Sequence, residues 1–137
     1  MTTMVTRTLS VTIDAPEEEV ARDLADPTTH PEWATDFFSG PAQVADGGEV
    51  VVAVPRMGGP ARFRVEADLS RGIFELYLAP VGADFGPPIP VRLVRNGTGV
   101  DVLFTLARFP GMTEEDWTSG LEGMARELQN LKRRHRG

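Results

Sequence analysis

Two arginines occupy positions where an apolar side chain is expected. Arg7 lies near the start of a segment in which apolar and hydroxyl side chains alternate, and Arg108 lies near the end of another alternating segment. Paired guanidinium groups can hold a carboxylate or phenolate of an otherwise apolar ligand. The alternative is that both side chains extend into water at the rim of an apolar face. Arg56 is a third, weaker candidate, because it continues the alternation of the strand before it.

Histidine, cysteine and metal chemistry have little support. His30 is the only histidine outside the basic C-terminal segment. It could act as a general base at a cavity mouth, or it could be a surface residue at the start of a helix. The chain has no cysteine, no acidic calcium-binding loop, no phosphate-binding loop and no dinucleotide fingerprint. We therefore predict no metal and no cofactor, and the catalytic residues remain unknown.

Length and charge restrict the classes of function. The 137 residues are expected to form one domain over residues 1–137, because two domains would each have a marginal core. A net charge of -6 argues against nucleic-acid binding, which needs a basic surface. No apolar run is long enough to insert into a membrane, and the first residues lack the apolar core of a signal peptide. A cytoplasmic monomer or homodimer is expected.

The N-terminal third predicts a strand followed by two short helices. Residues 5–14 alternate between apolar and hydroxyl side chains, which is typical of a strand with one buried face. Asp14 is expected to cap a helix whose first turn contains Pro16 and three glutamates. Thr29 and Glu32 have the spacing of a capping box and predict a second short helix, which carries Trp33 and Phe37.

The rest of the chain predicts six short strands and one long helix. Thr113 and Asp116 mark the start of the helix, and Gly120 and Gly123 inside it predict either a close backbone approach or empty space. The helix carries an apolar stripe formed by Trp117, Leu121, Met124, Leu128 and Leu131. The predicted strands are 42–45, 49–54, 61–68, 72–78, 89–95 and 99–109.

The turns predict which side chains share a face of the sheet. A two-residue turn at Asn96 and Gly97 would place Arg92 opposite Asp101, and the loop before residue 89 would place Glu75 opposite Arg92. A turn at Ser70 and Arg71 would place Glu66 opposite Glu75. The resulting polar face is interpreted as a solvated salt-bridge network rather than a catalytic group. It comprises Arg64, Glu66, Glu75, Tyr77, Arg92 and Asp101. The opposite, apolar face must pack against the long helix.

Several segments resemble one known superfamily. The strings V-T-I-D-A-P-E-E-E-V and A-D-P-T-T-H-P-E-W, with L-x-x-L-K near the C-terminus, are similar to the START-like SRPBCC superfamily. The strings R-F-P-G-M-T-E-E-D-W and F-T-L-A-R resemble its short bacterial polyketide cyclase/dehydrase-like members. The resemblance implies an α+β helix-grip fold, related to Bet v1, in which a curved seven-stranded antiparallel sheet wraps around a long C-terminal helix.

The superfamily includes lipid carriers, aromatase/cyclases and chaperone activators, so the resemblance leaves the function open. The first hypothesis is a module that binds a lipid, polyketide or aromatic molecule between the sheet and the helix. The alternatives are an aromatase/cyclase, in which Arg7, Arg108 or Tyr77 stabilises an enolate and His30 or a water moves protons, and a protein-interaction module. The predicted ligand-binding residues are Arg7, Trp33, Phe37, Phe63, Phe74, Leu76, Phe104, Arg108, Trp117, Leu121 and Met124.

Overall fold

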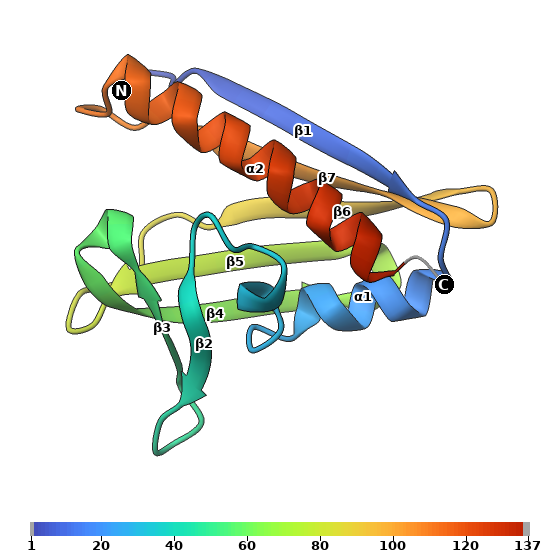
Figure 1. Ribbon diagram of the computed structural model, residues 1–137, viewed down its shortest axis with the longest axis horizontal. Helices are drawn as coiled ribbons and strands as arrows, with labels where there is room; N and C mark the ends of the chain where they lie inside the picture. Colours follow the sequence, from blue (N-terminus) through green and yellow to red (C-terminus); the bar gives the residue numbers. More distant parts are fainter. Residues whose placement is uncertain (1, 136–137) are drawn as a thin grey trace.

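A curved antiparallel sheet of seven strands partly encloses one long helix in the computed structural model, which describes residues 2–135 (Figure 1). The strand order is β1-β7-β6-β5-β4-β3-β2. This arrangement confirms the predicted helix-grip architecture. The elements are β1 (Thr6–Ile13), α1 (Glu17–Ala25), β2 (Ser39–Val44), β3 (Val50–Val54), β4 (Gly59–Asp68), β5 (Ile73–Pro80), β6 (Ile89–Asn96), β7 (Gly99–Ala107) and α2 (Glu114–Arg134).

Two of the three predicted helix starts differ from the expectation. The Thr113 hydroxyl accepts a hydrogen bond from the Asp116 amide at 3.0 Å, which confirms the predicted cap of α2. The predicted cap of α1 is wrong, because Asp14 accepts a hydrogen bond from the Thr98 hydroxyl and α1 begins directly after Pro16. The second short helix is a single 3₁₀ turn, His30–Glu32, and the Thr29 hydroxyl donates to backbone carbonyls instead of capping it.

The register of β4 and β5 follows the prediction, whereas that of β6 and β7 is shifted by two residues. Glu66 lies opposite Glu75, as expected. Asn96 pairs with Gly99, so the tight turn consists of Gly97 and Thr98, and Gly97 takes the left-handed conformation with φ of 59°. A shift of two residues returns each side chain to its original face, so the predicted faces are retained.

The polar face points away from α2, as predicted, although its pairing differs. Arg92 lies opposite Leu103 and Ile73, and neither Asp101 nor Glu75 is its direct partner. The Arg92 guanidinium nevertheless reaches Glu75 diagonally, with 3.0 Å between Nη2 and Oε1. Asp101 instead accepts a hydrogen bond from the Thr12 hydroxyl at 2.6 Å. The polar face is therefore a network of solvent-exposed side-chain contacts, whose partners differ from the predicted ones.

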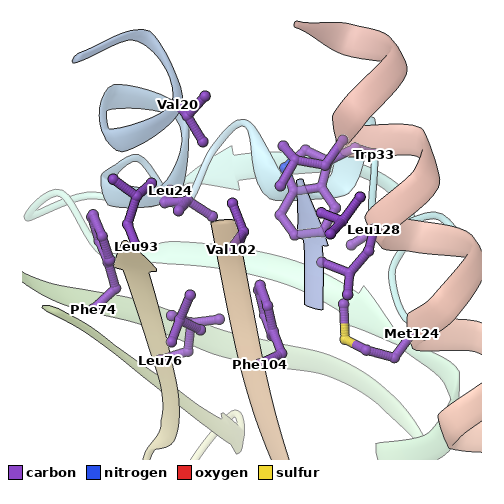
Figure 2. Packing of buried hydrophobic residues seen from close by; sticks show 14 of the residues in the cluster. Val20, Leu24, Trp33, Phe74, Leu76, Leu93, Val102, Phe104, Met124 and Leu128 are labelled. Carbon is purple, nitrogen blue, oxygen red and sulfur yellow. The ribbon is translucent and has the colours of Figure 1, made fainter. Parts of the chain in front are cut away.

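The apolar face forms the core together with α1 and the C-terminal half of α2. Figure 2 shows Trp33 against Leu128, and Met124 reaching toward the sheet from α2. Leu24 on α1 lies above Val102 on β7 in the same view. Seven of the predicted inward-facing residues are buried: Phe63, Phe74, Leu76, Val91, Leu93, Val102 and Phe104.

Candidate ligand-binding site

The two halves of α2 are buried to different extents. In the C-terminal half, Leu128 and Leu131 expose 2% and 0% of their surface. In the N-terminal half, Trp117 and Leu121 are only half-buried, although they belong to the same apolar stripe. Apolar area that stays in contact with water is available to a ligand, because covering it is favourable at about 25 cal/mol per Å². The N-terminal half of α2 is therefore the end at which a ligand would gain contact area.

Partly buried apolar side chains from other elements accompany this half of α2. Strand ends supply most of them, because β5 and β7 end, and β6 begins, at the side of the sheet next to the start of α2 (Figure 1). Each side chain packs against the core but remains partly accessible to water. They are Met57, Leu78, Ile89 and Leu106.

Arg56 ties the turn between β3 and β4 to α2. Its Nη2 donates to the Ser119 hydroxyl at 3.1 Å, and its Nη1 donates to the Asp116 carbonyl at 3.4 Å. A Cβ atom on Gly120 would lie 3.5 Å from Nη1, so this glycine faces the guanidinium. A Cβ on Gly123 would likewise lie 3.4 Å from Asp36. Both are ordinary contact distances, so neither glycine is required for a closer approach of the backbone.

The two inward-parity arginines come together on neighbouring strands. Arg7 pairs with Leu106, whose side chain belongs to the inner face, and the Arg108 amide donates to the Val5 carbonyl at 2.9 Å. Arg108 is half-buried, and its guanidinium donates to the Met112 carbonyl at 3.4 Å. Arg7 is exposed. Both residues lie at the same end of the sheet as the half-buried part of α2.

The aromatic candidates divide between the interior and this end. Trp33, at 1% exposure, packs edge-on against Phe104 with 6.0 Å between the ring centroids. Phe37 is half-buried and lies edge-on against Phe38. Among the other predicted ligand-binding residues, Trp117 and Leu121 are the partly accessible apolar ones. Those enclosed in the core are Trp33, Phe63, Phe74, Leu76, Phe104 and Met124.

His30 is neither a surface residue nor a group at a cavity mouth. It is 1% exposed, and its ring lies 5.1 Å from the Trp33 ring and 5.0 Å from the Phe63 ring. Its Nε2 hydrogen-bonds to the Leu24 carbonyl at 2.9 Å. Burial lowers the pKa of His30 to about 4, so the ring is neutral at physiological pH. The expected surface position is wrong, because the 3₁₀ turn directs this side chain inward.

Glu127 is a functional candidate that the sequence analysis missed. It is 4% exposed, and its Oε2 accepts hydrogen bonds from the amides of Asp36 and Phe37 at 3.0 and 2.8 Å. Burial raises the pKa of Glu127 to about 7. The sequence does contain a signal, since Glu127 lies three residues after Met124 and four before Leu131, on the apolar stripe. The carboxylate fastens the segment before β2 to α2.

Asp23 joins α1 to the C-terminal end of α2. Its carboxylate accepts from Arg134 Nε at 2.6 Å and lies 2.7 Å from His135 Nε2, and Arg134 also contacts Glu32. Burial alone would raise the pKa of Asp23, but the hydrogen bonds from Arg134 and His135 outweigh it and lower the pKa. This cluster closes the end of the fold opposite to Arg108.

Two hollows in the surface lie away from the expected interior. The larger, of about 860 Å³, follows the segment from Thr28 to β2 and is bounded by Pro31, Phe38 and Pro55. No residue of α2 lines it. The second, of about 440 Å³, lies at the Asp23 cluster.

Residues 2–135 contain no group of three histidine, cysteine or acidic residues that could hold a metal ion. No helix in this part of the chain is long and apolar enough to cross a membrane.

Solved structures share this architecture, although no protein-family model and no curated protein matches the sequence. A START superfamily protein from Mycobacterium smegmatis is 13% identical with a TM-score of 0.63, covering 95% of this chain and 96% of that one. The Aha1 protein from Colwellia psychrerythraea, solved as a dimer, is 20% identical with a TM-score of 0.65 over 96% of each chain. DynU16, from the dynemicin biosynthetic locus, is 18% identical with a TM-score of 0.61, covering 93% of this chain and 46% of that one. The chain therefore has the START-like helix-grip fold.

Proposed function

We propose that this protein binds a small apolar molecule, such as a lipid, polyketide or aromatic metabolite, between the sheet and the N-terminal half of α2. The observation that carries the proposal is the half-burial of Trp117 and Leu121 on a stripe whose other members are sealed. The fold supports it, because the same architecture occurs in a START superfamily protein. An apolar ligand would replace water on these side chains and on Leu106.

Binding of Nile red, a neutral apolar fluorophore, tests this function. Leu121→Gln should weaken Nile red binding about fivefold or more, because it places an amide in the proposed contact surface. The matched control is Leu69→Gln, which changes a leucine that is 53% exposed in the turn after β4. Failure of the wild-type protein to bind Nile red, or equal effects of the two variants, would overturn the proposal.

The two tryptophans give an internal reporter of the binding site. Trp33 is 1% exposed in the core, whereas Trp117 is half-buried on α2. Adding decanol should change the emission of Trp117 and leave that of Trp33 unchanged. The decanol response should therefore disappear in Trp117→Phe. A response that persists in this variant would place the ligand at another site.

A polyketide aromatase/cyclase is a second candidate, favoured by the structural similarity to DynU16 from the dynemicin biosynthetic locus. Two of the side chains considered for it lie away from the proposed ligand-contact surface of Trp117, Leu121 and Leu106. Tyr77 is on the outer face, with its ring 5.8 Å from the ring of Phe85, and His30 is enclosed in the core. Arg7 and Arg108 remain to stabilise an enolate. Turnover of a poly-β-keto substrate that is lost in Arg108→Gln would support this candidate, and unchanged turnover in that variant would exclude the assignment.

A further inference from the structure

Arginines of the sheet differ in whether a carboxylate neutralises them. On the outer face, Arg62, Arg64 and Arg92 each lie within 3.5 Å of a glutamate oxygen. Arg95 has inward parity at the α1 end of the sheet, and it bonds to Glu17 at 2.5 Å. Positive charge is therefore balanced locally over most of the sheet, as expected for a chain with 20 acidic residues.

Arg7 and Arg108 are the exceptions on the strands and their immediate ends. Within residues 2–135, neither guanidinium forms an ion pair with a carboxylate. Arg108 makes only long contacts to the Met112 carbonyl. Arg56, on the other side of α2, likewise contacts a carbonyl and a hydroxyl. Arginines without a carboxylate partner within residues 2–135 thus flank the incompletely buried half of α2, whose own acidic residues are confined to its first turn and to Glu122.

The strand register brings Arg7 and Arg108 close enough to act on one anion. Leu106 pairs with Arg7, and Arg108 follows Leu106 by two residues, so the two arginines are diagonal neighbours on the inner face. Diagonal neighbours on an antiparallel pair are about 7–8 Å apart, which long side chains span. Two adjacent cations repel each other, and a carboxylate between them would remove that repulsion while accepting charge-assisted hydrogen bonds.

We infer that Arg7 and Arg108 bind the carboxylate of an apolar acid, whose hydrocarbon or aromatic part lies against Leu106, Leu121 and Trp117. This inference rests on the proposed function and narrows its ligand class from apolar molecules in general to amphiphilic acids. The acid group stays at the end of the sheet where water has access to Arg7. The apolar part replaces water on the half-buried side chains, so both parts of the ligand are satisfied.

A set of three ten-carbon probes tests the inference. Decanoate, decanol and decylamine compete with Nile red at pH 7.5, the two charged probes below their critical micelle concentrations and decanol below its solubility limit. Wild-type protein should bind decanoate about 10-fold to 100-fold more tightly than decanol, and decylamine most weakly. Arg108→Gln should weaken decanoate binding at least fivefold with decanol unchanged. The double variant Arg7→Gln/Arg108→Gln should bind decanoate and decanol equally.

The control and the outcomes separate this inference from the proposed function. Arg22→Gln changes an exposed α1 arginine that has no ion pair within residues 2–135, and it should leave the preference for decanoate intact. Equal binding of decanoate and decanol by the wild type, or a preference that survives in the double variant, overturns the inference and leaves apolar binding standing. Failure of all three probes to displace Nile red, or failure of Nile red itself to bind, overturns the proposed function and the inference together.

Discussion

The two halves of α2 belong to one continuous helix but have different roles in the fold. The C-terminal half is held by buried leucines, by the hydrogen bonds of Glu127 to the segment before β2, and by the Arg134 ion pairs. The N-terminal half is joined to the β3–β4 turn through Arg56, and its apolar side chains remain partly exposed. Stability is therefore concentrated at one end, which leaves the other end able to exchange water for a ligand without unfolding the protein.

The largest expected difference between the halves comes from leucine truncation. Leu128→Ala should lower the free energy of unfolding by about 2–5 kcal/mol, because it opens a cavity at a residue that is 2% exposed. Leu121→Ala should cost about 1 kcal/mol or less, since water already contacts that side chain. Urea denaturation of both variants measures the pair. Equal losses would show that the two halves are equally closed.

Acid should weaken the closed end through His30. The pKa of this histidine is about 4 in the folded protein and about 6.5 when unfolded, so the unfolded chain binds more protons between these values. The stability contributed by neutral His30 is complete above pH 6.5 and falls by about 3 kcal/mol as the pH decreases to 4. Glutamine at position 30 cannot titrate. In urea titrations, the stability of His30→Gln relative to wild type should therefore rise as the pH falls from 6.5 to 4. Parallel pH curves would contradict the buried neutral ring.

Glu127 should give the opposite pH dependence at the same end of α2. Its pKa is about 7 in the folded protein against an ordinary value of 4.5, so the folded state binds more protons between these values. Its contribution to stability is present below pH 4.5 and is lost by about 1–3 kcal/mol as the pH rises through 7. Relative to wild type, Glu127→Gln should become more stable as the pH increases from 5 to 8. A constant difference would show that Glu127 does not titrate in this range.

The two helix glycines provide the smallest expected effects. Gly120→Ala should raise the free energy of unfolding by up to about 1 kcal/mol, because alanine favours the helix and its Cβ would only touch Arg56 at 3.5 Å. Gly123→Ala should gain less, since its Cβ would meet Asp36 in the closed half at 3.4 Å. Thermal melts of both variants test the order. A larger gain at Gly123 would contradict the tighter packing of that half.

The faces of the sheet could be predicted from the sequence, whereas the exact pairing could not. Alternation with a period of two assigns Phe63 and Phe104 to the core for any register that shifts by an even number. The alternation does not distinguish a turn at Asn96–Gly97 from the observed turn at Gly97–Thr98, because both turns place the same side chains on each face. That two-residue difference separates Arg92 from Asp101, because only the turn geometry fixes the partner.

Parts of the candidate site depended on contacts distant in sequence. Arg7 and Arg108 are about a hundred positions apart in the sequence, and only the strand order of the implied helix-grip fold makes their strands neighbours; β1 does pair with β7. The burial of His30 and Glu127 could not be inferred from local pattern alone, since each is satisfied by a backbone group of another element. The sequence does not reveal the partner of a buried polar residue when that partner is a backbone carbonyl or amide, because nearly every residue type supplies these groups.

The pairing of β1 with β7 has a consequence for how the chain acquires its structure during translation. β1 emerges from the ribosome first, yet its strand partner is the last strand to be made and its covering helix α2 follows still later. Val11 and Ile13 would therefore be unprotected on a nascent chain until β7 and α2 have been synthesised. Pairing between strands so far apart in sequence slows folding, because the entropy of closing the long intervening segment is lost before the β1–β7 contacts form.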